Sequence, residues 1–170
     1  FYKQLTPEQL SSIKVVTGDG AKWITECVNE YTPGCARCVD PFHVVEWAMT
    51  ALDEVRKDIW HDAYSEYKQV KKDNPRGKGR PKKDAPGLAI VKAAKAKADE
   101  IKGSAYALGK APEHLSEKQQ LRVNLIASQN PRLYRAYLLK EQLRLLLKLT
   151  NVDEAEDELK RWLWKASHSR

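Results

Sequence analysis

The apolar positions near the start of the chain predict a strand, a helix and a second strand. The first run is β-branched and apolar around one lysine and ends at Gly-Asp-Gly, so a buried strand is predicted near 13–18. Residues 21–31 have helical spacing and end before Thr-Pro-Gly, and a second short strand is predicted near 36–40. Strand, helix and strand so close in sequence indicate a βαβ unit with two parallel strands. Its helix is expected to turn Trp23, Cys27 and Val28 inward.

After Pro41 the apolar spacing changes to alternating steps of three and four, which is typical of helices. One long helix of about 30 residues is predicted from a stripe that only Arg56 and Glu66 interrupt. The stripe consists of Phe42, Val45, Met49, Leu52, Ile59, Ala63 and Val70. Proline and glycine then recur through residues 73–87, which predicts an exposed loop.

Further helices are predicted after this loop. A returning helix over 88–101 makes a helical hairpin with the long helix, and three more are expected near 115–128, 131–149 and 152–166. The predicted fold class is therefore an α/β start followed by a large all-helical region, mostly α overall. We place residues 1–60 in the α/β part and residues 61–170 in a helical insertion.

Charge is concentrated at the tip of the predicted hairpin. The formal net charge is +7, and residues 68–83 contain eight basic residues against Asp73 alone, so this segment carries the whole excess. Such a segment favours a local contact with a polyanion. Gly79-Arg80-Pro81 between lysines also resembles the core of an AT-hook, which binds the minor groove of DNA. The candidate DNA-binding residues are Arg76, Lys78, Arg80, Lys82 and Lys83; the alternative is a solvated basic loop.

The composition excludes several classes of protein. Hydrophobic residues make up 42% and charged residues 31%, which fits a folded chain rather than a disordered one. No apolar run approaches the roughly 20 residues that cross a membrane, and no signal segment begins the chain. Three cysteines without other signs of secretion favour reduced thiols and a cytoplasmic location.

The candidate catalytic residues follow the two predicted strands. Asp19 stands directly after the first strand and Asp40 directly after the second, with His43 three residues later. Because the carboxyl ends of parallel strands meet at one edge of a sheet, both carboxylates are expected there, where they suit a divalent metal. The alternatives are structural: Asp19 as a turn residue, Asp40 as a helix N-cap before Pro41, and His43 as a packing residue.

Two other groups of residues have a structural and a chemical interpretation. Cys35 and Cys38, with Cys27 and His43 nearby, have a spacing used for zinc, but no second Cys-x-x-Cys accompanies them. Glu141 is the one acid within an apolar helical stripe, and a pair with Arg144 or another arginine is expected to neutralise it.

Taken together, several motifs resemble the DDE region of the ISL-three family of insertion-sequence transposases, and the resemblance spans nearly the whole chain. The most specific is Asp-Pro-Phe-His at 40–43 and its spacing from Asp19. The motifs are Val16-Thr17-Gly18-Asp19-Gly20, Trp23-Ile24, Pro33, Asp40-Pro41-Phe42-His43-Val44-Val45, Ala51-Leu52-Asp53-Glu54-Val55-Arg56, Leu133-Tyr134-Arg135-Ala136-Tyr137-Leu138-Leu139-Lys140-Glu141 and Leu159-Lys160-Arg161-Trp162.

The resemblance implies an RNase H-like core and metal-dependent cleavage and transfer of DNA strands, with Mg²⁺ or Mn²⁺ as the cofactor. It makes Asp19 the second of three catalytic acids and a metal ligand, and gives Asp40 and His43 a supporting role. It places the first acid before Phe1 and the third, a glutamate, beyond Arg170, so this chain alone is expected to be inactive. The partners implied are transposon-end and target DNA and further copies of the full-length protein.

Two other functions remain open from the residues themselves. One is a non-catalytic helical protein that binds DNA through the basic segment 68–83. The other is a helical interaction module whose basic loop is merely solvated. Both predict that substitution of Asp19 or Asp40 is harmless in the full-length protein, whereas the transposase hypothesis predicts the loss of strand cleavage.

Overall fold

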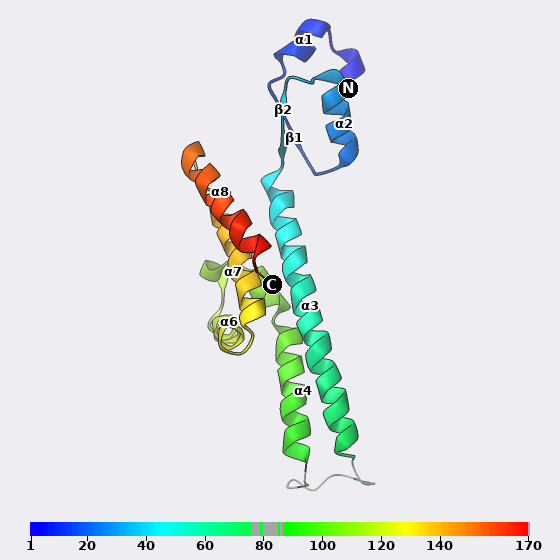
Figure 1. Cartoon of the computed structure of the whole chain (residues 1–170), viewed down its shortest axis with the longest axis vertical. Helices are drawn as coiled ribbons and strands as arrows, with labels where there is room; N and C mark the ends of the chain where they lie inside the picture. Colours follow the sequence, from blue (N-terminus) through cyan, green and yellow to red (C-terminus); the bar gives the residue numbers. More distant parts are fainter. Residues whose placement is uncertain (76–78, 80–84, 86, 170) are drawn as a thin grey trace. The chain divides into compact units, whose positions relative to one another are not determined.

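A computed structural model describes residues 1–75, 79, 85 and 87–169 (Figure 1). Contacts along the chain divide it into two compact units, Phe1–Ala48 and Met49–Arg170. Helix α3 (Pro41–Asp73) begins in the first unit and continues into the second. Within the described ranges, no helix has both the length and the apolar character needed to cross a membrane.

The first unit contains the predicted βαβ arrangement. Strands β1 and β2 are parallel neighbours, and their register runs from Val15 opposite Ala36 to Gly18 opposite Val39. Helix α2 connects them, which confirms the strand–helix–strand prediction. The elements of the unit are η1 (Tyr2–Gln4), α1 (Pro7–Ser12), β1 (Val15–Gly18), α2 (Lys22–Tyr31), β2 (Ala36–Val39) and the first turns of α3.

The prediction that β1 is a buried strand was wrong for this unit. Its side chains alternate between exposed and half-buried, because α2 lies on one face of the two-stranded sheet only. The prediction that Trp23 faces inward was also wrong, since 64% of this residue is exposed. Ile24 and Val28, four residues apart, occupy the face of α2 toward the sheet: Ile24 lies beside Gly18, and Val28 is buried. Trp23 is about 100° away from Ile24 around the helix.

The second unit is entirely helical in its described residues. The predicted helices are all present and differ from their predicted bounds by a few residues at most, while the short α5 and η2 were not predicted. Successive helices from α4 to α8 contact one another. Besides α3, the unit contains α4 (Leu88–Gly103), α5 (Ala105–Gly109), η2 (Pro112–His114), α6 (Glu117–Gln129), α7 (Pro131–Leu146) and α8 (Val152–Ser167).

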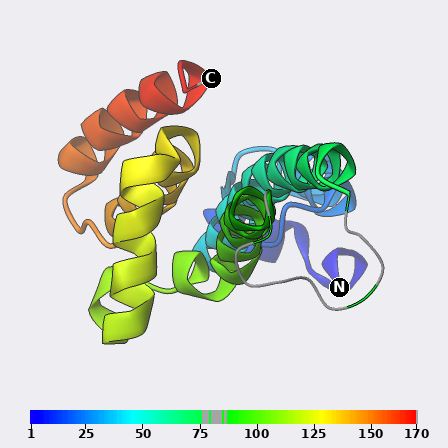
Figure 2. The ribbon, with the colours of Figure 1, turned by 90° about the horizontal axis from the view of Figure 1, so that it is seen from below.

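Most of the buried apolar side chains belong to this helical unit. In Figures 1 and 2, α4 returns alongside α3, as the hairpin prediction required. Small residues at Ala63 and Ala98 lie in the core that the two helices share. The core cluster consists of Leu52, Ala63, Ala98, Ile101, Ala107, Leu108, Val123, Ile126, Leu133 and Tyr137.

The charged interruption of the α3 stripe has a structural explanation. Arg56 is buried, and its Nε donates a hydrogen bond to Asp53 Oδ1 at 2.7 Å. Its Nη1 also donates to the carbonyl oxygen of Lys102, at 3.4 Å, near the C-terminus of α4. Because a helix ends with carbonyl groups that lack helical partners, a guanidinium there is stabilising. Arg56 therefore continues the inward face of α3 instead of breaking it.

Candidate catalytic site

Asp19 lies in the turn between β1 and α2. Its Oδ1 accepts a hydrogen bond from the backbone N–H of Ala21 at 2.9 Å, which fixes one carboxylate oxygen against the start of α2. The residue is exposed. Asp19 is therefore a turn residue, as its structural interpretation predicted, and its second carboxylate oxygen is accessible from solvent.

Asp40 lies next to Asp19 at the same end of the sheet. The backbone N–H of Asp40 donates to the carbonyl oxygen of Gly18 at 2.8 Å, which extends the ladder one residue beyond the Gly18–Val39 pair. The two aspartates thus follow directly on paired strand ends, as the parallel arrangement predicted. Asp40 Oδ1 also accepts from the N–H of Phe42 at 2.8 Å, so this residue caps α3 as the structural alternative required.

His43 belongs to the first turn of α3. Its backbone N–H donates to the carbonyl oxygen of Asp40 at 3.1 Å, and its Nδ1 lies 3.4 Å from Glu46 Oε2. The ring also stands edge-on to Phe42. His43 is only half-buried, so the imidazole is oriented by its own helix and remains accessible.

Two residues that the sequence did not single out support the Asp19 turn. Arg37, in the middle of β2, donates hydrogen bonds to the backbone carbonyl oxygens of Asp19 and Cys38. Trp47, in the second turn of α3, packs its ring against Gly20. A period-two pattern places Arg37 on the α2 side of the sheet, but no sequence signal pairs it or Trp47 with this turn.

The fit of a divalent metal to these residues is partial. Carboxylate oxygens are the ligands that Mg²⁺ prefers, and Asp19 and Asp40 each keep one oxygen outside the hydrogen bonds just described. Their carboxylates also have no basic partner among the ion pairs of the described residues. However, no three His, Cys, Asp or Glu side chains in that part of the chain gather closely enough to hold an ion.

The cysteines that offered a zinc spacing likewise do not assemble in the described residues. All three are free thiols, and Cys35 Sγ lies 3.4 Å from the hydroxyl of Thr32. Cys38 alternates with Arg37 on β2 and is exposed, whereas Cys27 lies on α2.

The predicted DNA-binding residues Arg76, Lys78, Arg80, Lys82 and Lys83 lie outside the described residues. The helices on either side of them are the last turns of α3 and the start of α4, as the hairpin prediction required. Lys68, Lys71 and Lys72 belong to α3 and are exposed.

Glu141 has the structural role that the sequence indicated. It is buried on α7, forms an ion pair with Lys140, and accepts from Arg144 Nε at 2.8 Å. Arg144 also binds Glu113 through two hydrogen bonds, at 2.8 and 3.1 Å. The Lys140 ammonium donates to the carbonyl oxygens of Leu108, at 2.9 Å, and Lys110. A carboxylate neutralised on two sides is a packing element rather than a metal ligand.

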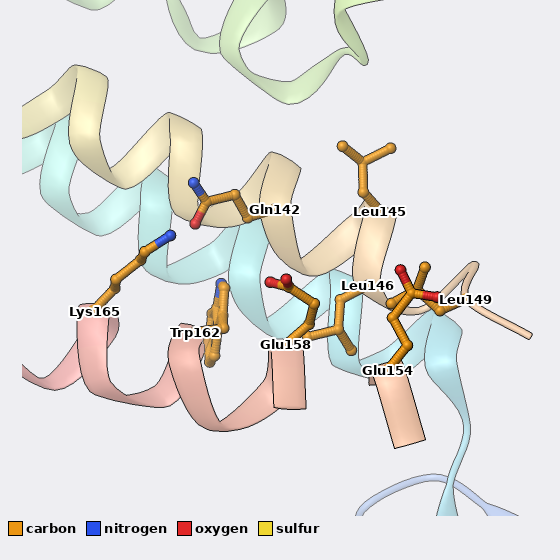
Figure 3. A pocket seen from close by; sticks show the side chains of 8 residues that line it. All are labelled: Gln142, Leu145, Leu146, Leu149, Glu154, Glu158, Trp162 and Lys165. Carbon is orange, nitrogen blue, oxygen red and sulfur yellow. The ribbon is translucent and has the colours of Figure 1, made fainter. Parts of the chain in front are cut away.

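A cavity of about 310 Å³ lies between α7 and α8 (Figure 3). Its apolar lining comes from three leucines and Trp162, and its polar lining from Gln142 on α7 and from Glu154, Glu158 and Lys165 on α8. Trp162 points from α8 toward α7, and its Nε1 donates to the carbonyl oxygen of Leu139 at 2.8 Å. This hydrogen bond gives Trp162 a packing role between α7 and α8.

Comparison with known proteins defines the class to which this arrangement belongs. A family model described as "Transposase" matches residues 1–170, the whole chain. The chain belongs to this family, the ISL-three group of DDE transposases, which confirms the resemblance seen in the motifs.

Relatives within the family are insertion-sequence proteins. The transposase for insertion sequence element IS1557, from two strains of Mycobacterium tuberculosis, is 40% identical over 171 residues. The alignment covers all of this chain and 36% of each relative, so the chain spans about a third of their length. No solved structure matches the chain, so the RNase H-like core stays a prediction; the sheet of the described residues is the parallel β1–β2 pair.

Proposed function

We propose that the full-length protein is a DDE-type transposase that cleaves and transfers DNA strands with divalent metal ions, and that Asp19 is one of its metal-binding carboxylates. The observation that carries the proposal is the juxtaposition of Asp19 and Asp40 on paired, parallel strand ends, each with one carboxylate oxygen held by a backbone N–H and no ion pair to a basic residue among those that the structure describes. Family membership and the relatives' printed function support it.

In this proposal the residues have separate roles. Asp19 binds the metal through the oxygen that Ala21 leaves free, and its exposure admits a DNA phosphate. Asp40 fixes the start of α3 and adds negative charge beside the ion, while His43 presents an imidazole that hydrogen-bonds a phosphate or a water. Mg²⁺ or Mn²⁺, when bound, supplies activation of a water or a 3′-hydroxyl and stabilises the leaving oxygen.

The proposal also predicts what this segment does alone. One aspartate cannot hold the two ions that in-line displacement at phosphorus uses, so the remaining carboxylates must come from the rest of the full-length protein. The 170-residue chain by itself is expected to bind metal weakly and to cut no DNA.

Substitution of Asp19 in the full-length transposase tests the function. Asp19→Ala should lower cleavage of transposon-end DNA at least about a thousandfold, because loss of a metal ligand removes several kcal/mol of transition-state stabilisation. DNA binding, measured by mobility shift in EDTA, should stay within about twofold of wild type. Asp62→Ala, the same change at an exposed acid of α3, is the matched control and should keep both activities. Full cleavage by Asp19→Ala would overturn the proposal.

DNA is the proposed substrate, and the basic segment is its proposed binding surface outside the catalytic site. Neutral substitution of Arg76, Lys78, Arg80, Lys82 and Lys83 should reduce the salt dependence of DNA affinity, by about 0.9 in the log–log slope for each DNA phosphate that the protein no longer neutralises. An unchanged slope would show that the loop is only solvated. If the full-length protein cleaved no transposon-end DNA while this slope fell, the protein would instead be a non-catalytic DNA-binding protein that acts through the 68–83 segment.

We further propose that the full-length protein works as a homo-oligomer in the cytoplasm. Strand cleavage at both ends of one element needs two active sites, and a second copy supplies the second. Light scattering of the protein bound to paired end fragments should give a mass of at least two copies.

A further inference from the structure

We propose that Trp47 and Arg37 are positioning residues for Asp19: they hold the Gly18–Gly20 turn from two sides and thereby set how tightly Asp19 binds a metal ion. The inference rests on the proposed function, in which Asp19 is a metal ligand. Arg37 donates to the backbone carbonyl of Asp19, and Trp47 packs on Gly20, so both act on the turn that carries the Asp19 carboxylate.

The contact between Trp47 and Gly20 is close enough to exclude a side chain at position 20. A Cβ atom built on Gly20 would lie 2.4 Å from Trp47 Cη2 and 2.5 Å from Cζ2, closer than real Cβ contacts. Gly20 has no positive φ, so its need for glycine arises from this close approach rather than from backbone strain. The indole therefore lies directly against the residue that follows Asp19.

Trp47 links this turn to the start of α3. It lies seven residues after Asp40, which caps the helix, and four after His43. About half of the residue (51%) is exposed, so much of the indole surface is not used for burial within the unit. Trp47 is accordingly expected to stabilise the fold less than a core tryptophan would. The part of its ring that is in contact lies against Gly20, in the turn that carries Asp19.

Arg37 holds the same turn from the strand side. Its guanidinium donates to the carbonyl oxygens of Asp19 and Cys38, one at the end of each strand region, and so ties the two strand ends together. Its Nε is buried and has no hydrogen-bond partner in the part of the chain that the structure describes. Since an unsatisfied buried donor costs free energy, Arg37 is not optimised for stability at this position.

The two contacts leave the Asp19 side chain with little freedom. The carbonyl of Asp19 is held by Arg37, its Oδ1 by the N–H of Ala21, and the next residue by Trp47. Residues that orient a metal ligand without touching the metal typically change affinity or activity about 10- to 100-fold when removed. Loosening this turn should therefore weaken metal binding while DNA binding through other parts of the protein persists.

Gly18 provides a matched control for Gly20 within the same turn. A Cβ atom on Gly18 would meet Ile24 Cδ1 at 3.5 Å and Arg37 Nη2 at 3.8 Å, both ordinary van der Waals contacts. Gly18→Ala and Gly20→Ala are the same chemical change, on either side of Asp19, and neither glycine has a positive φ. They differ in the contact with Trp47.

The test is made in the full-length transposase, with Mn²⁺ as the probe. Binding is measured from loss of the free-ion EPR signal, and cleavage from the Mg²⁺ concentration that gives half the maximal rate. Gly20→Ala and Trp47→Ala should each weaken Mn²⁺ binding about 10- to 100-fold and raise the required Mg²⁺ correspondingly, whereas Gly18→Ala should change either by less than about threefold. Trp47→Phe, which keeps an aromatic ring, should recover part of the loss.

The double variant isolates the contact itself. Because Trp47→Ala removes the ring that a Cβ at position 20 would strike, Gly20→Ala with Trp47→Ala should be no worse than Trp47→Ala alone. For Arg37, Arg37→Met should weaken Mn²⁺ binding about tenfold, and Arg37→Lys, which retains one donor group, should lose less.

The outcomes distinguish failure of the positioning role from failure of the proposed function. Additive losses in the double variant, or equal effects of Gly18→Ala and Gly20→Ala, would overturn the positioning role even if Asp19→Ala abolishes cleavage. Wild-type Mn²⁺ binding and cleavage by Asp19→Ala would overturn the proposed function instead. If circular dichroism shows that Gly20→Ala is unfolded, the Trp47 and Arg37 variants decide. Unchanged Mn²⁺ binding in both Trp47→Ala and Arg37→Met would then refute the inference, whereas losses that are smaller in Trp47→Phe and Arg37→Lys would support it.

Discussion

Asp19 and Asp40 in the first unit differ from Glu141 and Asp53 in the helical unit in the groups that bind their carboxylates. In Phe1–Ala48, Asp19 and Asp40 are held by backbone N–H groups and have no basic partner among the described residues. In Met49–Arg170, Glu141 is buried between Lys140 and Arg144, and Asp53 is bound by Arg56 and Lys57. The hydrogen bond from Lys57 is the main reason that the pKa of Asp53 lies below its usual value.

This difference separates carboxylates available for chemistry from carboxylates used for structure. A buried acid must be neutralised by a partner, and that partner then occupies the oxygens that a metal would need. An acid held only through one oxygen by backbone donors keeps its second oxygen for another ligand. The candidate catalytic residues of this chain therefore lie in Phe1–Ala48, which has the smaller hydrophobic core. The helical unit contains the larger core.

The buried ion cluster offers the largest expected effect on stability. Glu141→Gln would leave the Lys140 ammonium, only 4% exposed, without its carboxylate. The free energy of unfolding should fall by about 3–5 kcal/mol, as for other buried pairs that lose one partner. Urea unfolding measures this, with Glu113→Gln as the control, because Glu113 pairs with the same Arg144 from a half-exposed position and should cost less than about 1 kcal/mol. Equal losses would show that burial does not distinguish these acids.

The helical core is tested next by truncation of one apolar side chain. Leu133 is fully buried in the core cluster, so Leu133→Ala should lower the free energy of unfolding by about 2–5 kcal/mol. Leu121→Ala, the same change at a leucine that is 68% exposed, should stay within about 0.5 kcal/mol of wild type. Thermal unfolding followed by circular dichroism measures both. A small effect at Leu133 would contradict the placement of the main core in this unit.

Alkaline pH should weaken the same region through Tyr137. Burial, followed by the charge of Glu141, raises the pKa of Tyr137 from 10.0 to about 12. Because the folded state favours the protonated phenol, this contribution is complete below pH about 10 and is lost as the pH rises from about 10 to about 12, up to about 3 kcal/mol. Urea unfolding at pH about 9 and about 11.5 should therefore show a larger decrease in wild type than in Tyr137→Phe. Parallel decreases in the two proteins would refute the assignment.

The smallest predicted effect separates the two roles of Asp40. Asparagine caps a helix about as well as aspartate, so Asp40→Asn should leave the stability of the protein unchanged while it removes the negative charge beside Asp19. DNA cleavage by the full-length protein should fall about 10- to 100-fold if that charge supports the metal site. Asp40→Ala should lose the cap as well, with about 1 kcal/mol of stability. Cleavage at the wild-type rate by Asp40→Asn would show that Asp40 only caps α3 and does not support the metal site.

Much of the element order was predictable because secondary structure follows local spacing. The strands near 13–18 and 36–40 and the helix bounds after Pro41 agree with the structure within a few residues, and parallel pairing placed Asp19 beside Asp40. The short elements α5 and η2 were missed because five and three residues are too few for a periodic signal. The orientation of Trp23 was missed because a helical pattern gives an apolar side but not the surface that covers it.

By itself, the sequence determined the strands and the longer helices, the family and the positions of the two aspartates at neighbouring strand ends, since these depend on local periodicity, motif spacing and strand direction. Only the tertiary structure decided that Arg37 binds the carbonyl of Asp19, that Trp47 lies against Gly20, and that Lys140 joins Arg144 in neutralising Glu141. These contacts join side chains from different elements, or depend on which face of an element is covered. Packing between elements decides which side chains meet across elements and which face of a helix is buried, and local spacing does not encode that packing.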